Sequence, residues 1–147
     1  MTGRPRGGPR PGRATAAGLC ATLVGIGLAR FAYTPLLPAL ITEGWFPSSQ
    51  AAYLGAANLA GYLAGALGAR PLARRAAART ILRVMMLLVA VAFLACAVPL
   101  SFAWFFLWRF ASGVAGGIVM VLAAPTVLPH VPAARRGLAG GAIFTGV

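Results

Sequence analysis

The sequence predicts an all-α integral membrane protein, on the basis of its composition and the length of its apolar runs. Of its 147 residues, 60% are hydrophobic and only 10% are charged, whereas about 25% are charged in an ordinary soluble domain. The hydrophobic residues form continuous runs of about 19 to 27 residues, the length that a helix needs to cross a bilayer. Membrane barrels would instead show alternating segments of about ten residues. We therefore expect a bundle of helices embedded in lipid.

Four complete transmembrane helices and the start of a fifth are expected. Residues 1–13 are rich in Gly, Pro and Arg, which predicts a disordered basic cytoplasmic tail. The apolar runs that follow cover residues 14–41, 51–69, 80–98, 102–128 and, incompletely, 137–147. They are separated by a break at 43–47, a basic loop at 70–79, a tight turn at 99–101 and a second basic loop at 130–136.

The arginines predict the orientation of these spans. The net charge of +12 comes from 13 basic residues, all of them Arg, and one acid, Glu43. Eleven of the arginines fall in the tail, in the two basic loops or just inside a span, so all lie on one side of the membrane: Arg4, Arg6, Arg10, Arg13, Arg70, Arg74, Arg75, Arg79, Arg83, Arg135 and Arg136. Short loops rich in Arg stay in the cytoplasm. We therefore expect a bacterial plasma-membrane protein with a cytoplasmic N-terminus, with the lipid bilayer and not nucleic acid as its partner.

Two arginines, Arg30 and Arg109, lie within the predicted spans. From the helical rise, they are roughly 16 Å and 10 Å below the same membrane surface. A charged side chain costs at least about 2.5–3.5 kcal/mol at mid-membrane, so neither should face lipid. Helical spacing places Tyr33 and Thr34 on the face of Arg30. By the same spacing, Ser112 and Gly113 share the face of Arg109.

These two polar faces admit two explanations. They could line a cavity in which two fixed positive charges bind an anionic solute. Alternatively, each arginine could be structural, bonded to carbonyls that Pro35 and Pro38 leave free or to an acid outside this sequence. Asn58, in the second run, could likewise bond across helices or touch the solute. Gly61-x-x-x-Gly65, like the small-residue pairs of the fourth run, is typical of close helix packing.

Catalysis has few residues to work with. One Glu and one His, without Asp or Lys, cannot provide a carboxylate pair, a metal cluster or a catalytic triad. Cys20 and Cys96 form no metal-ligand spacing. We therefore expect no enzyme activity, no cofactor and no metal site.

Several stretches of the chain resemble the N-terminal part of a major facilitator superfamily transporter of the YbfB/YjiJ group. They are GIGLARFAYTPLLPAL (25–40), YLGAANLAGYLAGALGA (53–69), RFASGVAGGIVMVLAAPTVLP (109–129) and RRGLAGGAIFTGV (135–147). The resemblance implies secondary active transport of a small solute by alternating access. It also implies twelve spans in two six-span halves around a midplane cavity. The first and fourth spans would line that cavity, and the C-terminal spans missing from this sequence would complete it.

Individual motif positions carry this resemblance further. Arg109 and Gly113 match the Arg-x-x-x-Gly of the superfamily's fourth span. In the loop between the second and third spans, Gly65 and Arg70 fit the superfamily motif, and Arg74 and Arg75 lie close to its basic positions. Ala69 stands where the family has Asp, which removes the acid of that loop's usual interdomain charge contact.

Two other functions remain open at the level of sequence. A small four-span exporter working as a dimer would have a similar size, but such proteins rely on an acidic residue in the first span, where this chain has Arg30. A membrane subunit or scaffold without transport activity could be held together by the small-residue helix faces alone.

Overall fold

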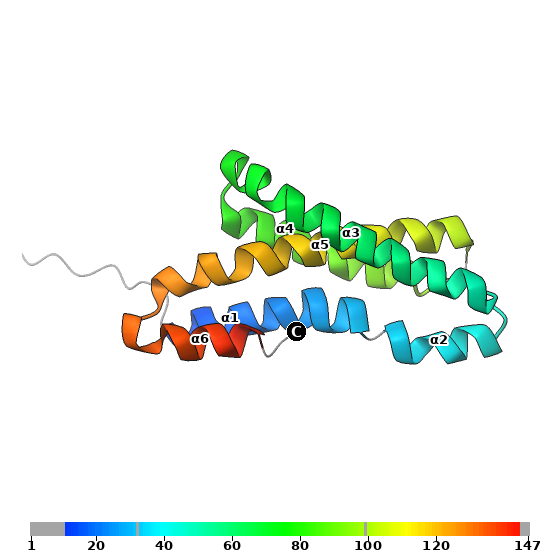
Figure 1. The fold of residues 1–147 in the computed structure, drawn as a ribbon, viewed down its shortest axis with the longest axis horizontal. Helices are drawn as coiled ribbons and strands as arrows, with labels where there is room; N and C mark the ends of the chain where they lie inside the picture. The colour runs from blue at the N-terminus through cyan, green and yellow to red at the C-terminus, as the bar shows by residue number, and fades with distance from the viewer. Residues whose placement is uncertain (1–10, 32, 99, 145–147) are drawn as a thin grey trace, which may run out of the picture.

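The chain folds into a bundle of long helices that lie lengthwise beside one another (Figure 1). The computed structural model describes residues 11–31, 33–98 and 100–144. Its helices are α1 (Pro11–Thr22), the π-helical η1 (Leu23–Phe31), α2 (Tyr33–Thr42), α3 (Ser48–Arg75), α4 (Ala78–Ala95), α5 (Phe102–Val127), the 3₁₀ turns Leu128–His130 and Ala133–Arg135, and α6 (Arg136–Phe144). No strand occurs in the described ranges. The prediction of an all-helical fold is confirmed for them.

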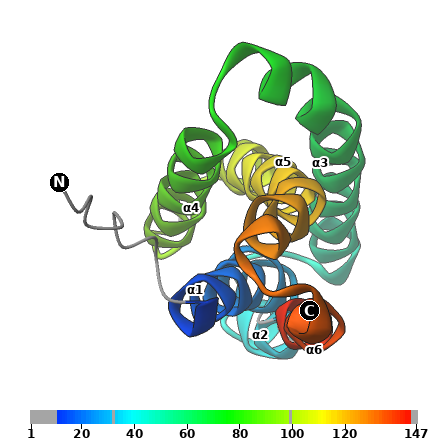
Figure 2. The ribbon, with the colours of Figure 1, turned by 90° about the vertical axis from the view of Figure 1, so that its left-hand side faces the viewer.

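Helix α5 is the centre of the bundle. Viewed end-on, it lies between α3 and α4, with α1, α2 and α6 along its remaining side (Figure 2). Half of its residues are buried, whereas α4 buries only Ile81, Val89 and Ala92. Helix α5 therefore supplies many of the groups that lie deep inside the bundle.

Helices α3 and α5 pack backbone against backbone through four glycines, Gly61, Gly65, Gly113 and Gly117, which we call the glycine interface. A Cβ added to Gly61 would meet the carbonyl oxygen of Phe110, and one added to Gly65 would meet that of Val114. Reciprocally, Gly113 lies against the carbonyl oxygen of Asn58, and Gly117 against that of Tyr62. The contacts rise together in residue number along both helices, so α3 and α5 run parallel. The sequence prediction of close packing at these glycines is confirmed.

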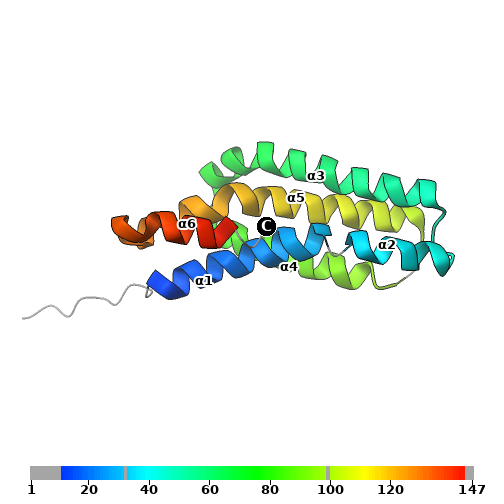
Figure 3. The ribbon, with the colours of Figure 1, turned by 60° about the horizontal axis from the view of Figure 1, so that its bottom comes forward.

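The other long helices run antiparallel to α5. Ile81, near the start of α4, clusters with Leu122, near the end of α5, and Val89 clusters with Ala115 further back. On the opposite side, Gly25 of η1 lies against Val119. Figure 3 shows the resulting side-by-side arrangement of α1, α4 and α5. These contacts fix the depth at which each residue of a neighbouring helix lies beside α5.

The first apolar run, expected over 14–41, is divided into α1, η1 and α2. In η1 the i→i+5 pattern replaces the α-helical one, so spacing based on 3.6 residues per turn does not carry through this stretch. Residue 32, between η1 and α2, lies outside the described residues. Helix α2 ends where Gly44 adopts φ +71°, and Trp45 N–H donates to the carbonyl of Leu40 at 2.9 Å. Glycine suits this left-handed cap because it has no Cβ.

Two predicted boundaries were wrong. Helix α1 begins at Pro11, so the predicted 1–13 tail includes three helical residues, and residues 1–10 lie outside the described ranges. Helix α3 continues through Arg75, so only residues 76–77 separate it from α4, where the sequence predicted a loop over 70–79. Ala, Leu and Arg are strong helix formers. Arg74 and Arg75 in the last turn also complement the negative end of the helix dipole.

Two of the described helices are long and apolar enough to cross a membrane, Ala78–Ala95 and Phe102–Val127. A shorter apolar segment covers Ala16–Gly27. Helix α3 is 28 residues long but carries Asn58, three arginines and many small residues, and it is not among the two. The structure therefore supports two of the four complete spans, and the other two stay predictions.

Candidate functional site

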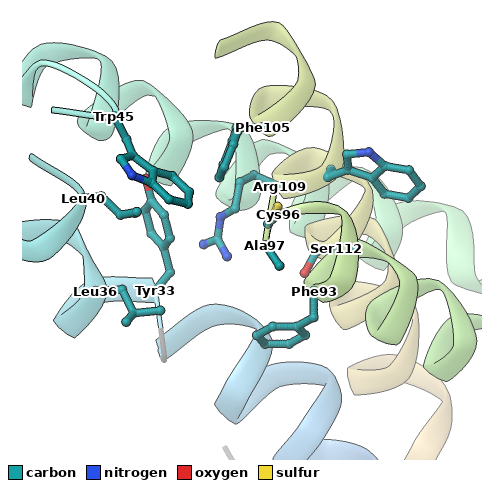
Figure 4. A pocket seen from close by; sticks show the side chains of 12 residues that line it. Tyr33, Leu36, Leu40, Trp45, Phe93, Cys96, Ala97, Phe105, Arg109 and Ser112 are labelled. Atoms are coloured by element: carbon teal, nitrogen blue, oxygen red, sulfur yellow. The ribbon is translucent and has the colours of Figure 1, made fainter. Parts of the chain in front are cut away.

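A cavity of about 330 Å³ lies between α2, α4 and α5 (Figure 4). The side chains around it come from these three helices and from the segments that follow α2 and α4. They are Tyr33, Leu36, Leu40, Trp45, Ala92, Phe93, Cys96, Ala97, Phe105, Trp108, Arg109 and Ser112. Three residues that the sequence singled out, Tyr33, Arg109 and Ser112, therefore meet at one cavity.

Arg109 supplies a formal charge to the cavity wall. The residue is only 8% exposed, although arginines are mostly exposed in folded proteins. The guanidinium carbon lies 4.0 Å from the centroid of the Tyr33 ring, so the two groups stack (Figure 4). A cation over an aromatic face gains up to about 2 kcal/mol when both are desolvated. Tyr33 thus holds the guanidinium in one orientation across the cavity.

Asn58 fixes the backbone of Arg109 from the neighbouring helix. It is 4% exposed, and its Nδ2 donates to the carbonyl oxygen of Arg109 at 3.0 Å. Asn58 does not belong to the cavity lining. Of the two roles left open by the sequence, the structure therefore shows the bond across helices. Because this bond uses the main chain of residue 109, it does not depend on the arginine side chain.

Three polar groups of the lining can hydrogen-bond to a ligand. Ser112 is 5% exposed and lies one helical turn after Arg109. Tyr33 Oη and Trp108 Nε1 are buried without a hydrogen-bond partner among the residues that the structure describes. A buried polar group left without a partner costs about 1–3 kcal/mol. A bound ligand that satisfied the hydroxyl and the indole N–H would recover part of that cost.

Aromatic side chains close one end of the cavity. The ring centroids of Trp45 and Phe105 are 6.0 Å apart and those of Phe46 and Phe105 are 4.8 Å apart, both in edge-to-face geometry. We call Trp45, Phe46 and Phe105 the aromatic lid. Trp45 follows an apolar run, a position typical of the membrane interface, but its side chain is half-buried in this lid. The Gly44 cap turns the chain back over the cavity.

The remaining predicted site residues lie elsewhere or are not described. The side chains of Arg30 and Thr34 are outside the described part of the structure, so their place on the cavity stays a prediction. Gly113 and Gly65 belong to the glycine interface. Arg70, Arg74 and Arg75 are exposed at the end of α3.

Ala69 explains one departure from the superfamily's loop motif. Its side chain is fully buried and clusters with Ile81, Ile118 and Leu122. An aspartate at this position would place a carboxylate in an apolar cluster. Packing at this position therefore favours the alanine.

No carboxylate is among the described residues that line the cavity. Glu43 is the only acidic residue of the chain, and it is exposed after the end of α2. Among the described residues, no three His, Cys, Asp or Glu side chains gather as metal ligands would. From its described side chains, the cavity offers a ligand the Arg109 cation, a few hydrogen-bond donors and a large apolar wall.

Comparison with known proteins identifies the family. Residues 22–147 match the family model described as uncharacterised MFS-type transporter YbfB. The chain belongs to this family. It is therefore a membrane protein of the MFS transporter type, as the sequence motifs predicted. No curated protein and no solved structure matches this MFS-type chain. The match covers every helix that lines the cavity.

Proposed function

We propose that this MFS-type chain forms the substrate-binding part of a secondary active transporter that moves a small organic anion across the bacterial plasma membrane by alternating access. The observation that carries the proposal is the buried Arg109 guanidinium on the wall of a 330 Å³ cavity. The chain would supply four spans and the start of a fifth, and further C-terminal spans would close the cavity from the other side.

The argument from charge rests on the fact that arginine does not lose its proton in proteins. Stacking on Tyr33 orients the guanidinium but leaves its charge in place. A charged group within a membrane span is costly and marks a substrate or ion pathway. Because the lining has no carboxylate, an anionic solute is the ligand that complements this wall. Arg30 would add a second charge to the same cavity.

The test is solute uptake by the whole transporter reconstituted in lipid vesicles. We expect counterflow of small organic anions and none of cations of the same size. Uptake of a cation that continues unchanged when both Arg30 and Arg109 are replaced by Gln would contradict the proposal. Uptake of anions that survives the same double replacement would place the binding site elsewhere in the protein.

The proposed orientation has its own test. Ser48 and Ala77 are both exposed and flank α3 at its two ends. In a chain lacking Cys20 and Cys96, a membrane-impermeant maleimide added to intact cells should label Ser48→Cys and leave Ala77→Cys unlabelled. Ala77→Cys should react once the membrane is permeabilised, which controls for its reactivity. The opposite pattern would show that the N-terminus is outside.

A further inference from the structure

We infer that the ligand of this cavity is an amphipathic anion, with a carboxylate head and an apolar body. The inference rests on the proposed function and narrows it to a substrate class. It follows from three properties of the described lining: the cation that Arg109 supplies, the apolar side chains around it, and the orientation that Tyr33 imposes on Arg109.

The apolar wall excludes strongly polar ligands. Leu36, Leu40, Ala92, Phe93 and Ala97 line the cavity and offer no side-chain hydrogen-bond donor or acceptor. A sugar or a polycarboxylate would bury hydroxyls or further charges against these side chains, at a cost of about 1–3 kcal/mol or more for each group. A hydrocarbon chain or a ring would instead be stabilised there by about 25 cal/mol for each Å² buried.

Among the described side chains of the lining, the Arg109 guanidinium is the group that can bind an anionic head. Tyr33 covers a face of the Arg109 guanidinium, but the N–H donors of that group point outward in its plane. A carboxylate can therefore approach the edge of the guanidinium and accept a charge-assisted hydrogen bond while the stacking contact remains. Ser112, three residues after Arg109 on the same helix, lines the same cavity and provides a hydroxyl for the head.

Apolar side chains that could contact the body of the ligand lie on both sides of Arg109. Trp45 and Phe105 form one end of the cavity, and Phe93 lies on the opposite side of Arg109 (Figure 4). The volume of about 330 Å³ is at the lower end of the range for small-molecule pockets. A six-carbon chain or a single ring is therefore the scale of body expected.

Protection of Cys96 tests this substrate class. Cys96 lines the cavity and is half-buried, so a bound ligand should shield its thiol from N-ethylmaleimide. In the whole transporter carrying Cys20→Ala, hexanoate and benzoate should each slow the labelling of Cys96 in a saturable way. At ten times the dissociation constant, labelling should slow about tenfold, because only about one site in eleven is then empty. Hexanamide, hexylammonium and acetate should protect far less at the same concentration.

The outcomes separate this inference from the proposed function. Equal protection by acetate and hexanoate would overturn the amphipathic class while leaving the anion proposal intact. Equal protection by hexanamide or hexylammonium would overturn both. Absence of protection by hexanoate and benzoate, together with no rise in the transporter's melting temperature when they are added, would also overturn the class. In Arg109→Gln both effects of hexanoate should disappear, whereas in Arg79→Gln, altered at an exposed arginine of α4, both should persist.

Discussion

A methyl group added at Gly65 should loosen the packing of α3 on α5, whereas the same methyl group at Gly68 should leave it unchanged. The Cβ of Gly65→Ala would overlap the carbonyl oxygen of Val114, a backbone atom that cannot rotate away. Nothing lies within 4 Å of a Cβ built on Gly68. Overpacking of this kind costs about 1–3 kcal/mol. The expected result is a lower melting temperature and lower membrane accumulation for Gly65→Ala alone.

This pair of variants isolates the contact between the helices. Both glycines lie inside α3, so both replacements gain the same helix propensity, about 1 kcal/mol. The difference between their melting temperatures in detergent therefore measures the overlap with α5. Gly117→Ala, which approaches α3 from the other helix, should reproduce the effect of Gly65→Ala. Equal melting temperatures for Gly65→Ala and Gly68→Ala would show that the two backbones are not in contact.

The glycine interface also shows what could be predicted from the sequence. Small residues four apart in an apolar helix bring backbones together, and the pattern at Gly61 and Gly65 needed no knowledge of the partner helix. The buried position of Arg109 and its grouping with Ser112 followed in the same way, from the cost of charge in a membrane and from helical spacing. Both predictions concern residues within one regular helix.

The parts that could not be predicted depend on contacts between distant segments. The stacking of Tyr33 on Arg109 requires the division of the first run and its antiparallel approach to α5, which no local pattern encodes. The burial of Trp45 depends on the Gly44 cap, which turns the chain back over the cavity. A tryptophan just beyond an apolar run is equally typical of a membrane interface. Asn58 was ambiguous because its partner is a main-chain oxygen, invisible to any side-chain pattern.

Replacement of Arg109 should abolish transport without disturbing the fold. Arg109→Gln removes the cavity's described charge and should reduce anion uptake to background. Arg109→Lys keeps the charge but loses the planar fork and much of the stacking surface. Losing one charge-assisted hydrogen bond, about 1.5–3 kcal/mol, corresponds to a decrease of about tenfold to a hundredfold in affinity. Uptake by the whole transporter in lipid vesicles, measured against solute concentration, gives both values.

The fold should survive because the contacts between α3 and this part of α5 do not need the arginine side chain. Asn58 donates to the main-chain oxygen of residue 109. Gly113 has no Cβ, so it can lie against the carbonyl oxygen of Asn58. Both variants should therefore accumulate in the membrane as the unmodified protein does. Arg79→Lys, altered at an exposed position on α4, should transport normally and controls for a general change of charge. If Arg109→Lys instead transported normally, the planar fork would not be needed to bind the solute. If both Arg109 variants failed to accumulate, the arginine would be needed for the fold.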